Sequence, residues 1–158
     1  VQSLSDEDWR DCLAINLDSA FYTMRAAVKV MNKNGGGSLV YLSSAAAQAG
    51  LPNHEAVGAA KAGLQGLVRN AAASYANKGI RANVVAPGMV ETNLSKDFLA
   101  NESGRKVSEA MHPTGRVGQP TDIARVIALL ADPASDWITG QTWSVDGGMA
   151  HLRQRVKG

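Results

Sequence analysis

The sequence predicts an α/β domain whose sheet is built from parallel strands. Helical and strand patterns alternate along the chain, and each connection between consecutive strands is long enough to hold a crossover helix, as parallel neighbours require. The chain has 158 residues, of which 45% are hydrophobic, so it can form one domain with a core and is not expected to be disordered.

The helices are predicted from apolar residues that recur at helical spacing. In chain order they cover residues 6–32, 53–77 and 120–131, and residues 93–111 are expected to form short helices in a polar, mobile lid. Ser5 is the expected N-cap of the first helix, and Pro52 and Asn53 are expected to open the second. Short apolar runs between turn residues predict strands at residues 38–44, 80–86 and 141–145.

Composition argues against several kinds of partner. The net charge of +2 is too small to indicate nucleic-acid binding, and no apolar run approaches the roughly 20 residues that would span a membrane. Cys12 is the single cysteine and can form no internal disulfide, so a reducing, cytoplasmic location is expected. His112 and His151 lack carboxylate or cysteine partners at ligand spacing, so no metal site is predicted.

Six stretches carry a resemblance to one protein family over nearly the whole chain. They are INLDSAF at 15–21, LVYLSS at 39–44, AAKAGLQGLVRNAAASYA at 59–76, GIRANVVAPGMVETNL at 79–94, GRVGQPTDIARVIALLADPASDWITGQ at 115–141 and VDGG at 145–148. Together, in this order, they resemble the short-chain dehydrogenases/reductases. The resemblance implies a Rossmann-type, doubly wound parallel sheet. It also implies an oxidoreductase that uses NAD or NADP to transfer hydride to or from a small alcohol or ketone.

The family's active site has four members: an asparagine on the first long helix, a serine after a strand, and a tyrosine and a lysine on the next helix. By position these fall on Asn16, Ser44, Val57 and Lys61. The tyrosine position is therefore a valine, which has no proton to exchange. The resemblance implies that Ser44 donates a hydrogen bond to the substrate oxygen and that Lys61 binds the nicotinamide ribose. The alternative for Lys61 is a solvated helix lysine.

His54 is the residue predicted to replace the missing acid. It lies three residues before Val57, on the same helix face if the helix has begun by that point. An imidazole can take up and release a proton near neutral pH, which suits proton transfer to or from a substrate oxygen. The alternative is an exposed histidine in a turn.

The stretch PGMVET, after the second predicted strand, resembles the family's clamp for the nicotinamide carboxamide. The resemblance implies cofactor contacts from Pro87, Gly88, Val90 and Thr92. The Val90 backbone is expected to bond the amide, and the Thr92 hydroxyl to reach the amide or a phosphate. The alternative is a turn that only ends the strand.

No glycine-rich phosphate loop follows a strand in this sequence. The glycine run at 35–37 ends a helix and precedes a strand, which is the reverse of the order that a dinucleotide fold requires. Residues 1–158 are therefore expected to form a single domain, the carboxyl-terminal, nicotinamide-binding part of such a fold. We expect an amino-terminal segment to pair with it, because the strand at 38–44 would otherwise expose a flat apolar edge.

Three functions remain open on the sequence alone. The first is an oxidoreductase with an atypical proton donor. The second is a catalytically impaired family member that binds dinucleotide or a partner subunit, and the third is a purely structural half used in oligomerisation. Retention of Asn16, Ser44 and Lys61 disfavours the third. The small-residue faces of the two long helices resemble the family's subunit interfaces, so a homodimer or homotetramer is expected.

Overall fold

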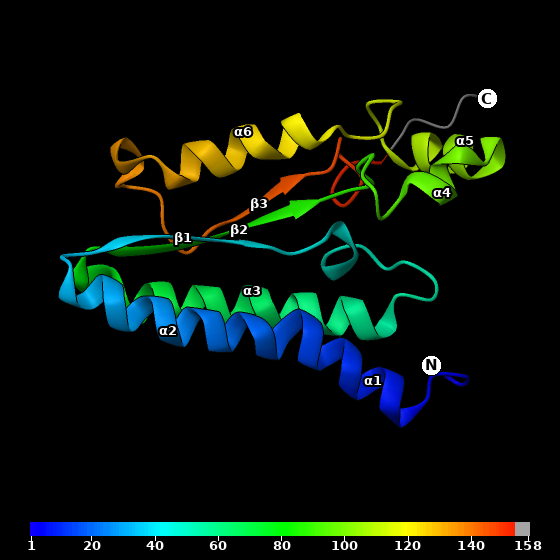
Figure 1. The fold of residues 1–158 in the computed structure, drawn as a ribbon. Helices are drawn as coiled ribbons and strands as arrows, with labels where there is room; N and C mark the ends of the chain where they lie inside the picture. Colours follow the sequence, from blue (N-terminus) through cyan, green and yellow to red (C-terminus); the bar gives the residue numbers. More distant parts are fainter. Residues whose placement is uncertain (154–158) are drawn as a thin grey trace.

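A three-stranded parallel sheet with helices on both faces forms the centre of the protein in a computed structural model that describes residues 1–153 (Figure 1). The strands are β1 (Gly37–Leu42), β2 (Ile80–Pro87) and β3 (Thr142–Val145), in the order β1-β2-β3. Both pairs are parallel, with Val40 opposite Asn83 and Val85 opposite Trp143. The predicted α/β fold with parallel strands is confirmed, although β1 ends two residues earlier than predicted.

The first long helix is continuous but changes its winding in the middle. It consists of α1 (Asp6–Leu13), a π-helical segment (Ala14–Asp18) and α2 (Ser19–Lys33). Ser5 caps its start, as predicted, because the Ser5 side chain accepts a hydrogen bond from the Asp8 N–H at 3.0 Å. The sequence pattern does not predict the π-helical segment around Asn16, because apolar residues keep their helical spacing through it.

The second long helix, α3 (Glu55–Tyr75), begins two residues later than predicted. Asn53 has a φ of 61°, in the left-handed region, which asparagine tolerates better than most residues but which no α-helix contains. Pro52 and Asn53 therefore form a turn, and the prediction that they open the helix is wrong. His54 takes the N-cap position. Within residues 1–153, neither α3 nor any other helix is long and apolar enough to cross a membrane.

Helices cover both faces of the sheet. α2 and α3 lie on one face, and α6 (Pro120–Ala131), which confirms the third predicted long helix, lies on the other (Figure 1). The core on the α2 and α3 side includes Met24, Leu64, Val68, Ile80 and Val84, and the core on the α6 side includes Val85, Ile123 and Leu130. Every residue of β2 from Ile80 to Ala86 is buried, as expected for the central strand of a parallel sheet.

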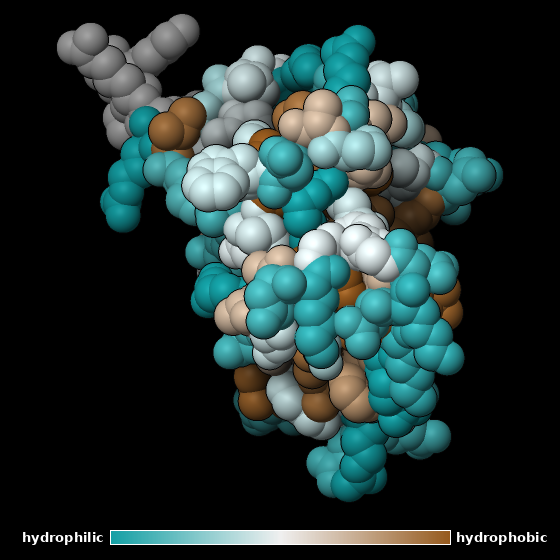
Figure 2. Space-filling model, turned by 90° about the vertical axis from the view of Figure 1, so that its left-hand side faces the viewer, coloured by the Kyte–Doolittle hydropathy of each residue, from teal (hydrophilic) through white to brown (hydrophobic). Residues whose placement is uncertain are grey.

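Two short helices, α4 (Lys96–Ala100) and α5 (Glu102–Met111), lie at the end of the molecule where the strands finish (Figure 1). They confirm the short helices predicted for the lid region, whose mobility stays a prediction. Leu99 anchors α4, since only 2% of this residue is exposed. At the opposite end, where the strands begin, hydrophilic and apolar side chains are interspersed over the surface (Figure 2).

β1 is an edge strand in the described part of the chain. Its only hydrogen-bonded neighbour among residues 1–153 is β2. Leu42, at the end of β1, is 47% exposed. An unpaired edge of this kind presents free N–H and C=O groups that can pair with a further strand.

Candidate active site

A cavity of about 220 Å³ lies at the carboxyl end of the sheet, between the strand ends and the lid. Its lining includes Ser44 from the loop after β1, His54 from the start of α3, and Pro87 and Gly88 from the end of β2. This is the edge at which open α/β folds bind their ligands. The other predicted site residues, Asn16, Lys61, Val90 and Thr92, are not part of the lining.

Ser44 keeps its hydroxyl proton available to a ligand. Its Oγ accepts a hydrogen bond from the Ala46 N–H at 3.1 Å, at the start of a 3₁₀ turn, so the O–H is free to donate into the cavity. The preceding Ser43 is used differently. It is buried, its Oγ donates to the Lys61 carbonyl oxygen at 3.1 Å, and it accepts from Gln65 at 3.0 Å. Ser43 therefore fixes the end of β1 to α3, which places Ser44 at the cavity.

His54 presents one ring nitrogen for proton exchange. Its Nδ1 lies 2.7 Å from the Pro52 carbonyl oxygen, and because a carbonyl can only accept, Nδ1 carries a proton. Nε2 is then the nitrogen that can exchange a proton with a ligand. His54 is exposed, sits at the N-cap of α3 rather than inside the helix, and lines the cavity, whereas Val57 does not.

Lys61 and Asn16 lie close to Cys12, away from the cavity lining. The Lys61 ammonium donates to the Leu42 carbonyl oxygen, at the end of β1, at 3.0 Å. Burial lowers the pKa of Lys61, and the nearby Cys12 thiol opposes this shift when it is ionised. The Asn16 side chain donates to the Cys12 carbonyl oxygen at 3.0 Å. The π-helical segment that carries Asn16 packs against α3, the helix that carries Lys61.

The clamp loop, residues 87–92, is held by two sets of backbone contacts. Val90 pairs with Gly118 through a short parallel bridge, in which the Glu91 N–H donates to the Gly118 carbonyl oxygen at 2.9 Å. The Ser95 hydroxyl donates to the Val90 carbonyl oxygen and accepts from the Thr92 N–H at 3.0 Å. Among residues 1–153 the Val90 N–H has no hydrogen-bond partner, so it is available to a ligand carbonyl.

His112 is a site residue that sequence reasoning considered only as a metal ligand. It is 2% exposed, its Nδ1 donates to the Ser108 carbonyl oxygen at 2.6 Å, and its Nε2 accepts from the Met89 N–H at 3.1 Å. Gly88 packs so closely on the ring that a Cβ there would lie 2.5 Å from Nε2. The only sequence signal for this role is its place at the end of the lid. In the described part of the chain, no group of three or more His, Cys, Asp or Glu side chains could hold a metal.

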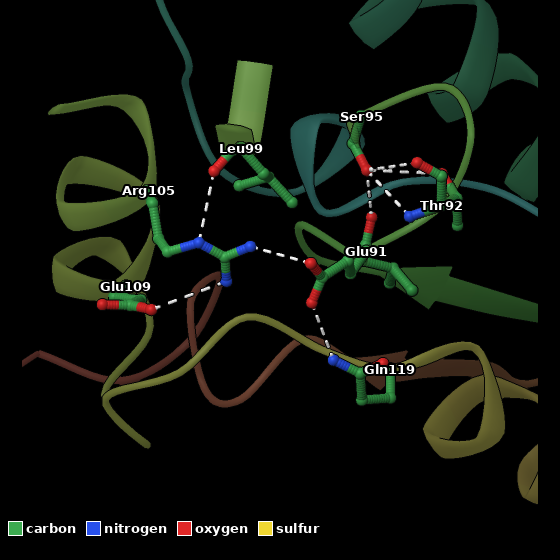
Figure 3. A network of polar contacts seen from close by, with 8 residues as sticks. Glu91, Thr92, Ser95, Leu99, Arg105, Glu109 and Gln119 are labelled. Atoms are coloured by element: carbon green, nitrogen blue, oxygen red, sulfur yellow. Dashed lines mark hydrogen bonds and ion pairs between the residues drawn. The ribbon is translucent and has the colours of Figure 1, made fainter. Parts of the chain in front are cut away.

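A polar network ties the clamp loop to the lid and to the start of α6 (Figure 3). The Glu91 carboxylate accepts from Arg105 of α5 at 2.7 Å and from Gln119 at 3.0 Å. These hydrogen bonds, first that from Arg105, lower the pKa of Glu91. Arg105 also donates to the Leu99 carbonyl oxygen at 3.2 Å and lies 3.9 Å from Glu109. The lid is thus connected to the loop that follows β2.

The fold and the site together define an α/β protein with a ligand cavity at the carboxyl ends of parallel strands. The family profile described as enoyl-(acyl carrier protein) reductase matches residues 1–150 of the chain. This chain belongs to the short-chain dehydrogenase/reductase family.

The chain is similar to named dehydrogenases in sequence and to solved dehydrogenase structures in fold. A cyclohexanol dehydrogenase from Acinetobacter sp. (strain SE19) is 40% identical over 147 residues, which cover 93% of this chain and 57% of the relative. The structure of a gluconate 5-dehydrogenase from Burkholderia cenocepacia in complex with NADP and tartrate matches with a TM-score of 0.91 and 29% identity, over 96% of this chain and 60% of that one. A short-chain type dehydrogenase/reductase from Mycobacterium ulcerans matches with a TM-score of 0.92 and 28% identity, over 97% and 56%. The chain therefore spans less than two thirds of each of these proteins.

Proposed function

We propose that this chain is the catalytic and nicotinamide-binding part of an oxidoreductase that transfers hydride between NAD or NADP and a small alcohol or ketone. The observation that carries the proposal is the cavity at which Ser44, His54 and the start of the clamp loop meet. The name of the cyclohexanol dehydrogenase and the NADP complex of the gluconate 5-dehydrogenase support it.

The polar groups of the cavity fit the two tasks of carbonyl reduction. When bound, the nicotinamide supplies or accepts the hydride. The free hydroxyl proton of Ser44 stabilises the charge that develops on the substrate oxygen. Nε2 of His54 gives a proton to that oxygen in reduction and takes one from it in oxidation, while the Nδ1 bond to Pro52 holds the ring. His54 is the atypical proton donor that takes the role of the missing tyrosine.

The remaining site residues fit the cofactor. The unpartnered Val90 N–H can donate to a carboxamide oxygen, and the Thr92 hydroxyl, 3.3 Å from Ser95 Oγ, lies in the same loop. Pro87 and Gly88 bring this loop to the cavity. Lys61, held at the end of β1, is the group proposed for the nicotinamide ribose, and Asn16 supports that region through the π-helical segment.

An amino-terminal segment is proposed to complete the dinucleotide fold. The free edge of β1 and the greater length of the relatives support this proposal, because the phosphate loop would lie on the added strands. The intact mass of the denatured natural subunit tests it. A subunit heavier than 16.6 kDa is expected, and a natural subunit of 16.6 kDa would contradict the proposal.

A homodimer or homotetramer, assembled through the outer faces of α2 and α3, is the proposed assembly in the cytoplasm. Phe21 and Tyr22 of α2 are 44% and 55% exposed, and Phe21 lines a hollow between α2 and α3 together with Leu67. Light scattering of the full-length protein is expected to give a dimer or tetramer. A monomer at micromolar concentration would contradict this assembly.

A catalytically impaired family member is the second candidate, and Val57 is the observation that favours it. Titration of the full-length protein with NADH and NADPH, followed by a carbonyl panel, separates the possibilities. Quenching or shifting of cofactor fluorescence together with oxidation of the cofactor supports the enzyme. Binding without oxidation supports the impaired member, and absence of binding supports a structural half used in oligomerisation. In the enzyme, Ser44→Ala is expected to lower kcat, because the substrate oxygen loses its donor.

A further inference from the structure

Most of the cavity lining besides Ser44 and His54 is apolar. The side chains that form it are Leu51, Met89, Phe98, Val107, Met111 and Met149. Ser108 and His112 also line the cavity, but both ring nitrogens of His112 are already hydrogen-bonded within the protein, so Ser108 adds one hydroxyl. Within the described part of the chain, no Asp, Glu, Lys or Arg side chain lines this cavity. A ligand therefore finds a few uncharged polar partners, Ser44, His54 and Ser108, in a lining that is otherwise mostly hydrocarbon.

The lid turns its apolar side toward the cavity. Val107 and Met111 are four residues apart on α5, so they project from one face of that helix. They are 58% and 40% exposed, and Phe98 of α4 is 53% exposed. An apolar ligand that covers these partly exposed side chains removes them from water, and this burial favours binding.

The charged residues of the lid make their contacts elsewhere. Arg105 reaches Glu91 outside the cavity (Figure 3), and Lys106 pairs with Glu102 at 2.7 Å on the surface of α5. The polar composition of residues 93–111 thus conceals an apolar inner face. A substrate with a carboxylate or several hydroxyls would lose its water here and find neither a cation nor enough hydrogen-bond partners. Its binding would therefore be unfavourable.

We infer that this site takes a compact, apolar secondary alcohol or the corresponding ketone, with a single ring and its one oxygen directed to Ser44 and His54. An apolar cavity of about 150 Å³ holds a benzene molecule, so the 220 Å³ here has room for a single six-membered ring. The inference rests on the proposed function. In reduction, the carbonyl carbon gains a hydride from the reduced nicotinamide, the oxygen gains a proton, and the nicotinamide becomes oxidised.

The first test compares two six-carbon carbonyl compounds on the full-length protein. Cyclohexanone represents the apolar ring, and 5-ketogluconate carries a carboxylate and hydroxyls. The expected kcat/KM with the preferred cofactor is about a hundredfold higher for cyclohexanone, because the polar groups of 5-ketogluconate would lie unpaired against the apolar wall. Equal or better reduction of 5-ketogluconate overturns the inference and leaves the oxidoreductase itself supported.

The second test places the same charge change at two consecutive positions of α5, of which only residue 107 lines the cavity. Val107→Glu puts a carboxylate into the apolar wall and is expected to lower kcat/KM for cyclohexanone about tenfold or more. Lys106→Gln removes one positive charge from the outer surface of the same helix and is expected to change it less than about twofold. Equal effects of the two substitutions contradict the apolar contact.

Binding gives a readout that does not depend on turnover. With reduced cofactor present, cyclohexanone is expected to raise the Tm of the wild type but not that of Val107→Glu. If the Tm rises while no carbonyl compound is reduced, the proposed hydride transfer is wrong, but the inferred class of ligand is supported. If cyclohexanone neither reacts nor shifts the Tm, the inferred ligand class is wrong.

Discussion

His112 holds Met89 in place, because its buried ring accepts a hydrogen bond from the Met89 N–H at 3.1 Å. The other ring nitrogen donates to the Ser108 carbonyl oxygen, so the ring is neutral with its proton on Nδ1. Met89 stands between Gly88 and Val90 in the clamp loop. This one side chain therefore links the end of the lid to the backbone that is proposed to bind the nicotinamide.

Replacing His112 is expected to weaken cofactor binding as well as stability. His112→Phe keeps a buried ring but leaves the Met89 N–H unpaired, which costs about 1–3 kcal/mol. His112→Gln can restore an acceptor and is expected to recover part of both losses. Chemical denaturation and NADPH titration of the full-length protein measure the two effects. If His112→Phe binds NADPH as the wild type does, the ring does not position the loop.

The contact between Glu91 and Arg105 is expected to restrain the lid. Both side chains are more than one third exposed, at 41% and 36%, so solvent screens the pair and its contribution to stability is small. Glu91→Gln is therefore expected to raise the dissociation rate of the cofactor about twofold, and added salt to reduce the difference from wild type. Stopped-flow fluorescence measures this rate.

The surface pair of Glu102 and Lys106 provides the control for that restraint. Its atoms are also 2.7 Å apart, but both residues lie on α5 and do not contact the clamp loop. Glu102→Gln is expected to leave cofactor dissociation unchanged. If both glutamine variants release the cofactor at the wild-type rate, the contact between Glu91 and Arg105 does not restrain the lid.

Placing a tyrosine at position 57 is expected to bypass His54. Val57 lies one helical turn before Lys61, so a tyrosine there would present a hydroxyl near the lysine that the family uses to activate it. In a His54→Ala background, Val57→Tyr is expected to raise kcat about a hundredfold, the usual scale of acid–base catalysis. Val57→Phe adds the ring without the hydroxyl and is the control. Equal rates for Tyr and Phe would exclude a proton-donor role at this position.

Asp122 is expected to make stability sensitive to acid. Its hydrogen bond from Arg116, at 2.7 Å, and a second from the Gln119 N–H lower the pKa of Asp122 from 3.8 to about 2. Because the pKa is lower in the folded state, the stabilisation is present above pH 3.8 and is lost as the pH falls through 2. Urea unfolding of wild type and Asp122→Asn is expected to show curves that converge below about pH 3. A constant difference down to pH 2 would contradict this linkage.

The helices and strands could be predicted from the sequence because the spacing of apolar residues and the position of turn residues are properties of short stretches of chain. The start of α3 was missed because proline and asparagine are equally suited to open a helix and to form a turn, and only the left-handed backbone of Asn53 decides between them. The π-helical segment around Asn16 has no local signature, since its neighbours keep their helical spacing.

Some features of the candidate site could likewise be predicted from the sequence and others could not. The location of Ser44 and of residues 87–92 could be predicted because both directly follow parallel strands, whose carboxyl ends meet at one edge, whereas their roles stay a prediction. His112 could not be assigned its role, because its partner Met89 lies 23 residues away and meets it only when the lid is folded. The apolar face of the lid was hidden because Val107 follows the charged Arg105 and Lys106, and Glu109 lies between Val107 and Met111 in the sequence.

The central claim is that His54 transfers the proton, a role that the proposed function gives to it instead of a tyrosine at position 57. The most direct measurement is the single-turnover rate of cofactor oxidation by the full-length protein with cyclohexanone, for wild type, His54→Ala, Val57→Ala and the exposed control His151→Ala. Loss of turnover in His54→Ala alone, with cofactor binding unchanged, is the predicted result. Equal rates in wild type and His54→Ala would contradict the account.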